Sequence, residues 1–328
     1  MKTIYRLDAS AIKAAAGCMR KLYWLVVKGY SGRGIYNDVA YGSAFHIFKD
    51  TLKKTLDPNK ACDEAYKYLK QAIKSDYFRI RPKKEFMDLA HLAETCQAYI
   101  ERFGVMHEKD TFQSLVDSDN TAIIVERKFQ IPLLETDNYI IFLCGTIDDI
   151  GKFSNGIYAI ADEKVTSYWD KEKFFRPFKL STQLITYAWA LRWHIRTFID
   201  KPLFKELADK NITACINGVF VARDKPTEFI RSQTVVIDDS LMDEYEAGLN
   251  NIVDDLTFYL DSDNKFIPSR EGIMNDACYG KFNEPCQFAE ACYSPDEETA
   301  IAICERIFDK TIYNPLEHRD LTINNNQL

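Results

Sequence analysis

Three strand-like segments follow one another in the middle of the chain with only short breaks between them. Residues 121–133 are rich in Ile and Val, and residues 138–150 and 156–166 are largely apolar. The breaks at 135–138 and 154–156 consist of residues that favour turns. Breaks this short join strands that run in opposite directions, so we expect three antiparallel neighbours in one sheet.

The remainder of the chain is mainly helical in its pattern. Helices are expected over residues 8–28, 39–55, 61–75, 84–108, 179–198, 240–262 and 296–308, and strands over 213–223 and 229–237. This order predicts an α/β fold with a mixed sheet core flanked by helices. We expect a single domain over 1–314, with an α-helical insert over about 56–115, an irregular cysteine-bearing C-terminal extension, and a polar tail over 315–328.

Acidic side chains stand near the ends of the second and third strands. Asp148 closes the segment that begins at Gly145, and Asp162 precedes Lys164 by two positions. Alternate residues of a strand point to one face, so Asp162 and Lys164 should share a face with Asp148, while Glu163 should point to the opposite face. Two carboxylates beside an ammonium group can hold a divalent cation next to a water molecule or phosphate. The pattern indicates metal-dependent cleavage of a phosphodiester; the alternative is a set of solvated charges.

Four further polar residues lie on predicted elements near these acids. His46 lies on the helix predicted for 39–55, where a structural role is the alternative to a functional one. Gln183 and Tyr187 are four residues apart and therefore share one helix face. Glu126, on the first strand, is either an outer-shell or third carboxylate of the site, or a surface residue.

The chain contains nine cysteines, and an odd number does not suit a disulfide framework. Cys278, Cys286 and Cys292 lie on the irregular segment together with Gly and Pro residues. This setting suits ligation of a metal or a cluster better than core packing. The alternatives are an iron–sulfur cluster, structural Zn²⁺, and thiols that bind no metal.

The net charge of −7 argues against a general nucleic-acid binder, but it allows a local basic channel. Such a channel has candidate residues over 164–180 and 79–84, where Lys and Arg gather. The N-terminus lacks the apolar core of a signal peptide, and no apolar run of about 18 residues is present. We therefore expect a cytoplasmic protein without a membrane partner.

Five motifs of the chain occur together in one order. They are Gly42-x-x-x-His46, Glu126, Gly145-x-Ile147-Asp148, Asp162-x-Lys164 and Gln183-x-x-x-Tyr187. In this order the chain resembles the PD-(D/E)XK nuclease superfamily, and specifically its RecB-like exonuclease branch, over about residues 10–225. The resemblance implies a restriction-endonuclease-like core and a metal-dependent DNA exonuclease that acts on a single strand or a duplex end.

The resemblance also implies a role for each site residue. His46, Asp148 and Asp162 would bind Mg²⁺ or Mn²⁺. Lys164 would orient the attacking water or stabilise the charge of the transition state. Gln183 and Tyr187 would belong to the helix that contacts the DNA.

Many RecB-like nucleases hold a 4Fe–4S cluster with one N-terminal and three C-terminal cysteines, and the resemblance therefore adds Cys18 to the C-terminal three. The family often has a Cys-x-x-Cys spacing where this chain has seven residues between Cys278 and Cys286. Arg20 and Lys21, next to Cys18, are candidates for contact with the DNA backbone, with a surface role as the alternative.

Similar stand-alone chains include phage recombination exonucleases and the nucleases that trim spacers in CRISPR adaptation. The resemblance thus implies DNA as the substrate and protein partners in a recombination or CRISPR-adaptation complex. Two other hypotheses belong to different classes. One is a catalytically silent nucleic-acid-binding or assembly module of the same fold, and the other is a redox protein built around the cluster.

Overall fold

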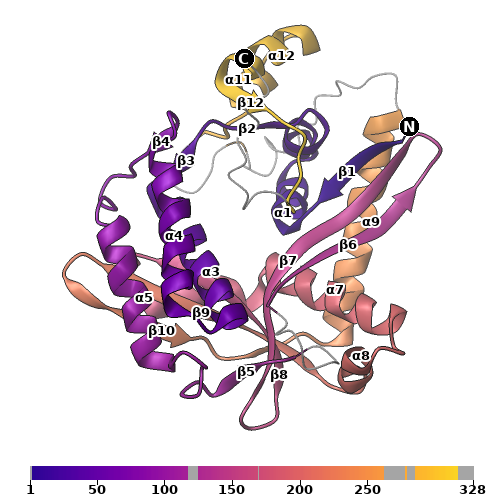
Figure 1. The fold of residues 1–328 in the computed structure, drawn as a ribbon. Helices are drawn as coiled ribbons and strands as arrows, with labels where there is room; N and C mark the ends of the chain where they lie inside the picture. The colour runs from indigo at the N-terminus through magenta and orange to yellow at the C-terminus, as the bar shows by residue number, and fades with distance from the viewer. Residues whose placement is uncertain (1, 117–124, 169, 262–277, 279–284, 317–328) are drawn as a thin grey trace. The chain divides into compact units, whose positions relative to one another are not determined.

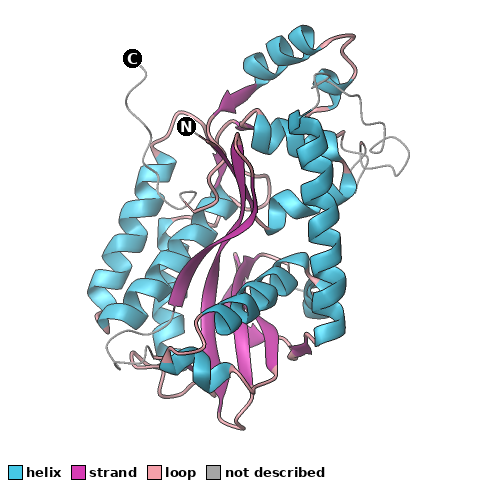
Figure 2. Ribbon diagram, turned by 90° about the vertical axis from the view of Figure 1, so that its right-hand side faces the viewer, coloured by secondary structure: helices cyan, strands magenta, loops and turns pink. Residues whose placement is uncertain are grey.

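The computed structural model describes residues 2–116, 125–168, 170–261, 278 and 285–316. The fold is α/β, with a mixed sheet flanked by helices, as the sequence predicts (Figures 1 and 2). Contacts divide the chain into two compact units. The first comprises Met1–Arg33, Phe129–Gly145 and Ser240–Glu317, and the second comprises Gly34–Lys128 and Thr146–Asp239. Each unit is described by itself.

In the first unit, strand β1 (Thr3–Leu7) runs parallel to the first half of β7 (Tyr139–Phe153), with which β6 (Val125–Glu135) also pairs. Strand β2 (Tyr30–Gly32) pairs antiparallel with β12 (Phe308–Lys310). The helical elements are α1 (Ala9–Gly17), α2 (Met19–Leu22), the π-helical turn η1 (Tyr23–Val27), α9 (Asp239–Asp261), α11 (Ala289–Cys292) and α12 (Glu297–Ile307).

In the second unit, the second half of β7 pairs antiparallel with β8 (Tyr158–Thr166) and with β5 (Phe112–Ser114). Strand β9 (Ile212–Ala222) runs parallel to β8 and antiparallel to β10 (Lys225–Arg231) and β11 (Val235–Val236). Two short strands, β3 (Ile35–Tyr36) and β4 (Phe78–Arg79), pair with each other. The segment after β8 contains α6 (Lys171–Phe175), the 3₁₀ helix η2 (Arg176–Leu180), α7 (Thr182–Thr197) and α8 (Pro202–Leu207).

Three helices of the second unit, α3 (Asn37–Thr55), α4 (Pro58–Ile73) and α5 (Leu89–Phe103), pack together around an aromatic core (Figure 1). Phe45 and Phe48 of α3 lie edge-on to Tyr99 of α5, and all three are buried. Carboxylates cap two of the helices. Asp57 accepts hydrogen bonds from the first turn of α4, and Asp88 does so for α5. These caps and the apolar faces of the helices form the predicted insert.

The structure confirms most predicted elements and corrects several. The strands predicted at 138–150 and 156–166 are β7 and β8. The helix predicted over 8–28 is interrupted at Cys18, whose backbone is extended, and β1 was not predicted. The following predictions lie outside the described residues: the strand start at 121–124, most of the irregular segment 264–295, and the tail beyond 316.

No helix within the described ranges is long and apolar enough to cross a membrane.

Gly145 should be needed for packing in the first unit, because a Cβ placed on it would lie 2.6 Å from Cζ of the buried Phe129. We expect Gly145→Ala to lower the free energy of unfolding by about 1–3 kcal/mol through overpacking. Urea denaturation measures the change. Gly248→Ala is the matched control, because nothing lies within 4 Å of a Cβ at this exposed helical position. Equal stability of the two variants would contradict the packing argument.

Candidate active site

Strands β7 and β8 together bury four carboxylates. Asp148, Asp149, Asp162 and Glu163 are 6%, 1%, 0% and 2% exposed. The register pairs Asp149 with Ala161, so Asp149 and Glu163 lie on one face of the strands, while Asp148 and Asp162 lie on the other. Glu163 thus points away from Asp162, as predicted. Burial of an ionised carboxylate is costly unless the carboxylate is paired. The groups that pair with the carboxylates on each face therefore decide what that face can bind.

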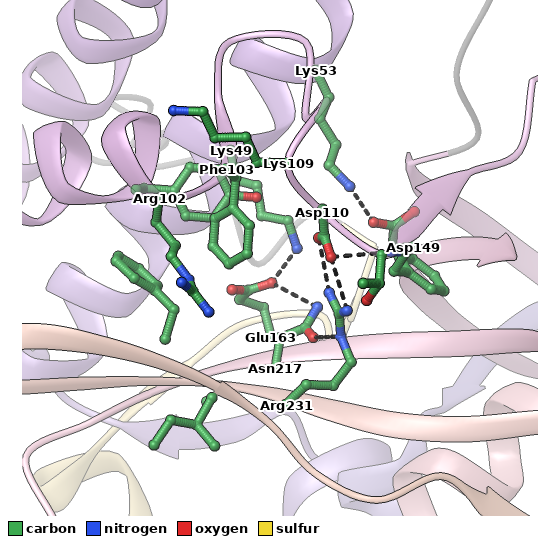
Figure 3. A pocket seen from close by; sticks show the side chains of 16 residues that line it. Lys49, Lys53, Arg102, Phe103, Lys109, Asp110, Asp149, Glu163, Asn217 and Arg231 are labelled. Atoms are coloured by element: carbon green, nitrogen blue, oxygen red, sulfur yellow. Dashed lines mark hydrogen bonds and ion pairs between the residues drawn. The ribbon is translucent and has the colours of Figure 1, made fainter. Parts of the chain in front are cut away.

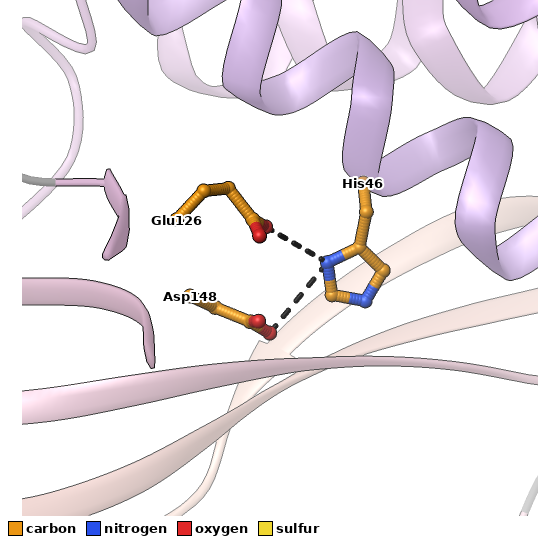
Figure 4. A group of neighbouring side chains, drawn as sticks. All are labelled: His46, Glu126 and Asp148. Atoms are coloured by element: carbon orange, nitrogen blue, oxygen red, sulfur yellow. Dashed lines mark ion pairs between the residues drawn. The ribbon is translucent and has the colours of Figure 1, made fainter. Parts of the chain in front are cut away.

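The candidate site contains a compact group of three side chains, those of His46, Glu126 and Asp148 (Figure 4). The Nδ1 atom of His46, on α3, lies 3.5 Å from Oδ2 of Asp148 and 3.6 Å from Oε1 of Glu126. One ligand atom from each residue lies within 4.8 Å of the others. The Glu163 N–H donates a hydrogen bond of 2.9 Å to Asp148 Oδ2, which fixes that carboxylate against the neighbouring strand.

Glu126 has a left-handed backbone conformation, with φ of 51°. This conformation is uncommon for residues other than glycine, and it costs on the order of 1–3 kcal/mol. A strained backbone of this kind persists only where the surrounding structure imposes it. Here the strained residue, Glu126, is the one whose carboxylate faces His46. The structure therefore places Glu126 in the same group of ligand atoms as His46 and Asp148, where the sequence left a third carboxylate, an outer-shell residue and a surface residue open.

Asp162 forms a second, adjoining arrangement with residues of β8 and α7. Lys164 Nζ lies 2.6 Å from Asp162 Oδ2, and Gln183 Nε2 donates to Asp162 Oδ1 at 3.0 Å and to the Tyr187 hydroxyl at 2.7 Å. Burial raises the pKa of Asp162 to about 6; the Lys164 ammonium opposes this shift and the Asp148 carboxylate adds to it. Gln183 and Tyr187, predicted to contact DNA, thus serve first to hold Asp162, and Tyr187 is itself buried.

The donor atoms of this face suit a divalent cation such as Mg²⁺ or Mn²⁺. Glu126, Asp148 and Asp162 carry three negative charges when ionised, and Lys164 supplies one positive charge beside the imidazole of His46. Carboxylate oxygens and an imidazole nitrogen are ligands that these cations accept. A cation would offset the remaining negative charge, so the residues present fit the metal that the sequence predicted. Asp162 is not part of the compact group that the sequence predicted it would form with His46 and Asp148.

On the opposite face of the two strands, lysines of α3 neutralise the buried carboxylates. The sequence did not predict this role for these lysines. Lys49 forms an ion pair with Glu163, and Lys53 forms one with Asp149. Lys53 also donates to Ser114 Oγ at 2.8 Å. Both lysines are more than nine-tenths buried. Their four-residue spacing on a helix with buried Phe45, Phe48 and Leu52 was the one sequence signal for this role.

In the first unit, burial raises the pKa of the Cys278 and Cys292 thiols, and the nearby Cys18 and Cys286 raise both further. The Cys286 N–H donates to the Cys278 carbonyl oxygen at 2.7 Å. Within the described residues, the four thiols do not form a compact group of metal-ligand atoms. All four are partly exposed, and Cys286 and Cys292 pack against a buried aromatic cluster that includes Trp24.

Arg20 was predicted to contact the DNA backbone, and the structure corrects this expectation. Only 4% of Arg20 is exposed, and its positive charge lowers the pKa of Cys278 and Cys292. Its guanidinium group therefore lies near these thiols and favours their ionised form. Lys21, the next residue, is partly exposed.

Comparison with known proteins does not assign the chain. No protein-family model matches it, and no curated protein matches it. The solved structure titled "Crystal structure of SSO0001" is 12% identical, with a TM-score of 0.26, over 88% of this chain and 95% of that chain. A likeness at this level does not support an assignment.

Asp162→Asn should stabilise the metal-free protein at neutral pH. The pKa of Asp162 in the folded state, about 6, lies above its ordinary value of 3.8, so the folded state binds the proton more tightly. Stability of the wild type is therefore lost as the pH rises from about 4 to above 6, by up to about 3 kcal/mol. The asparagine side chain does not ionise, so the variant should not lose this free energy of unfolding as the pH rises. Urea denaturation in EDTA at pH 5.0 and pH 7.5 measures it.

The exposed acid Asp63 on α4 provides the control, because Asp63→Asn should change stability equally at both pH values. An Asp162→Asn variant that gains no stability relative to wild type between pH 5.0 and pH 7.5 would contradict the raised pKa.

Proposed function

We propose that this chain is a metal-dependent DNA exonuclease of the RecB-like branch of the PD-(D/E)XK superfamily, with a restriction-endonuclease-like core. The observation that supports this most is the group of His46, Glu126 and Asp148 beside the Asp162–Lys164 pair. Helix α3 and strands β6, β7 and β8 contribute these residues in the order of the motifs. Neither arrangement alone would distinguish a nuclease from a structural ion-pair network.

His46, Glu126 and Asp148 would hold Mg²⁺ or Mn²⁺ in this proposal. A bound cation supplies Lewis acidity toward a phosphate oxygen and lowers the pKa of a bound water. The carboxylate of Asp148 is held by the backbone of Glu163, and the Gln183 amide holds Asp162. The protein thus presents fixed oxygen ligands and does not need to order them when substrate binds.

Lys164 would act directly on the reacting groups. Its side chain is 30% exposed, although its ammonium lies 2.6 Å from the fully buried carboxylate of Asp162. An ammonium held in this way can donate a hydrogen bond to the attacking water or to an oxygen of the scissile phosphate as charge develops. Asp162 orients the ammonium, and Gln183 and Tyr187 position Asp162 in turn.

The substrate of this proposal is a DNA strand recognised through its backbone. Arg176 and Lys179, in the segment between β8 and α7, are exposed and lie within twelve and fifteen residues of Lys164 in the chain. Cations at this place can contact phosphates without reading bases, so cleavage should have little sequence preference.

We further propose that Cys18, Cys278, Cys286 and Cys292 bind a 4Fe–4S cluster. Cys18 and Cys286 raise the pKa of the Cys278 and Cys292 thiols, and Cys286 and Cys292 pack against an aromatic cluster, which supports this proposal. Arg20, buried beside them, offsets part of the negative charge of the thiolates. A cluster in this place joins residues that are far apart in sequence and would stabilise the first unit.

Lys164→Gln should reduce Mn²⁺-dependent degradation of end-labelled DNA by at least about 100-fold, because it removes a donor that acts in the transition state. The fold and the Mn²⁺ affinity should be retained. Asp148→Asn should lose both cleavage and Mn²⁺ binding. Rates on single-stranded and duplex ends, with EDTA as a blank, and Mn²⁺ titrations give the two readouts.

Lys67→Gln, at a lysine that is 75% exposed on α4, is the matched control and should cleave at the wild-type rate. A wild-type protein that binds Mn²⁺ and DNA without cleaving would instead support the silent binding module. Cleavage by Lys164→Gln at the wild-type rate would exclude the proposed role of the lysine.

Protein purified without oxygen should contain about four iron atoms per chain and the broad visible absorption of an iron–sulfur cluster. Cys286→Ala should lose both, and it should be less stable because the link among distant segments is gone. Cys144→Ala, at a buried cysteine of the first unit outside this group, should retain the iron. One equivalent of zinc without iron would assign these thiols to a structural zinc site.

A further inference from the structure

The second unit contains a cavity of about 220 Å³ behind the candidate active site, on the face of the sheet that α3 covers (Figure 3). Lys49, Glu163, Asn217 and Arg231 lie along its inner part, and Arg102 and Lys109 line it as exposed residues. Asp149 and Glu163 point toward this cavity, whereas Asp148 and Asp162 point to the other side of the strands. Lys49 and Lys53 also border the small pocket at His46, Glu126 and Asp148, whereas Arg102 and Lys109 line the cavity alone.

The side chains that line the cavity carry an excess of positive charge. Five are basic and three are acidic, which leaves two positive charges. The basic residues are Lys49, Lys53, Arg102, Lys109 and Arg231, and the acidic residues are Asp110, Asp149 and Glu163.

Each acid already has a buried basic partner. Lys49 pairs with Glu163, Lys53 pairs with Asp149, and Arg231 donates two hydrogen bonds to Asp110, at 3.0 and 2.9 Å. These three pairs neutralise one another and build a fixed inner wall.

Arg102 and Lys109 account for the excess charge. Lys109 Nζ donates to the backbone oxygen of Glu101 at 3.2 Å and has no carboxylate partner among the described residues. Arg102, on the last turn of α5, forms no ion pair within the described part of the chain. A guanidinium and an ammonium at one cavity are suited to a phosphate group, since both bind such anions through charge-assisted hydrogen bonds.

The remaining wall of the cavity is aromatic. Phe103 and Phe229 lie 5.6 Å apart between ring centroids, and Tyr99 contacts both. The volume corresponds to about seven water molecules, which exceeds what a phosphate group alone would fill. Asn217 adds an amide, held by Arg231 Nε at 2.6 Å. Charged groups, an amide and aromatic rings around one cavity are typical of a site for a small organic ligand.

We propose that this cavity binds a small phosphate monoester, with Arg102 and Lys109 on the phosphate and the organic part against Tyr99, Phe103 and Phe229. The two excess charges match a phosphate dianion. A nucleoside 5′-monophosphate has the required combination of a dianion and a flat ring. The inference does not depend on the proposed nuclease function, because neither Arg102 nor Lys109 belongs to the metal group.

The test is isothermal titration of the full chain in EDTA, without DNA, with adenosine 5′-monophosphate, inorganic phosphate and adenosine. We expect the monophosphate to bind saturably, inorganic phosphate to compete with it, and adenosine alone to bind at least about tenfold more weakly. Arg102→Gln and Lys109→Gln should each weaken binding of the monophosphate by about tenfold or more. Both residues are exposed, so the variants should fold.

Two controls locate the binding. Lys70→Gln, at an exposed lysine of α4 outside the cavity, should bind like wild type, and so should His46→Ala at the metal group. Absence of saturable binding by any phosphate probe would overturn the proposal. So would adenosine binding as tightly as the monophosphate, or binding that is lost in His46→Ala and kept in Arg102→Gln.

Discussion

Burial of four carboxylates on two neighbouring strands is the constraint on which the second unit depends. Asp148 and Asp149 are adjacent on β7, and Asp162 and Glu163 are adjacent on β8. An ionised carboxylate taken out of water costs several kcal/mol unless a partner compensates it. Strand alternation divides the four into two pairs on opposite faces, so each face needs its own compensation. Lysines of α3 supply it on one face, and His46 of α3 and Gln183 of α7 contact the acids of the other.

The two faces are compensated differently. On the face of Asp149 and Glu163, each acid has one buried lysine, and the pairs are neutral. Removal of one lysine would leave an uncompensated buried charge, so this face is fixed. On the other face, Glu126 and Asp148 adjoin His46, and Lys164 pairs with Asp162, whose pKa burial raises. Carboxylates outnumber ammonium groups there, as in a site that can bind a metal cation.

Strand alternation is the property that the sequence expresses most directly, and it predicted which face Asp148, Asp162 and Glu163 occupy. It did not predict Lys49 and Lys53, because helical spacing alone does not show whether a sheet will cover that face. Cap residues and apolar periodicity predicted most helices. The break at Cys18 escaped prediction because its local signal is a single glycine, Gly17, and one glycine is tolerated within a helix.

Glu126 shows a second limit of sequence reasoning. A left-handed backbone within a strand depends on tertiary contacts. The direction of the Glu126 side chain could therefore not be predicted from the alternation of residues along the strand. Arg20 was misjudged for a similar reason: beside Lys21 it reads as one of two surface cations, yet the short helix after Cys18 directs it inward. Its charge lies near Cys278 and Cys292 and lowers the pKa of both thiols. In the second unit, Lys49 and Lys53, which a sequence shows as surface charges, are placed by the opposite charges that the fold buries.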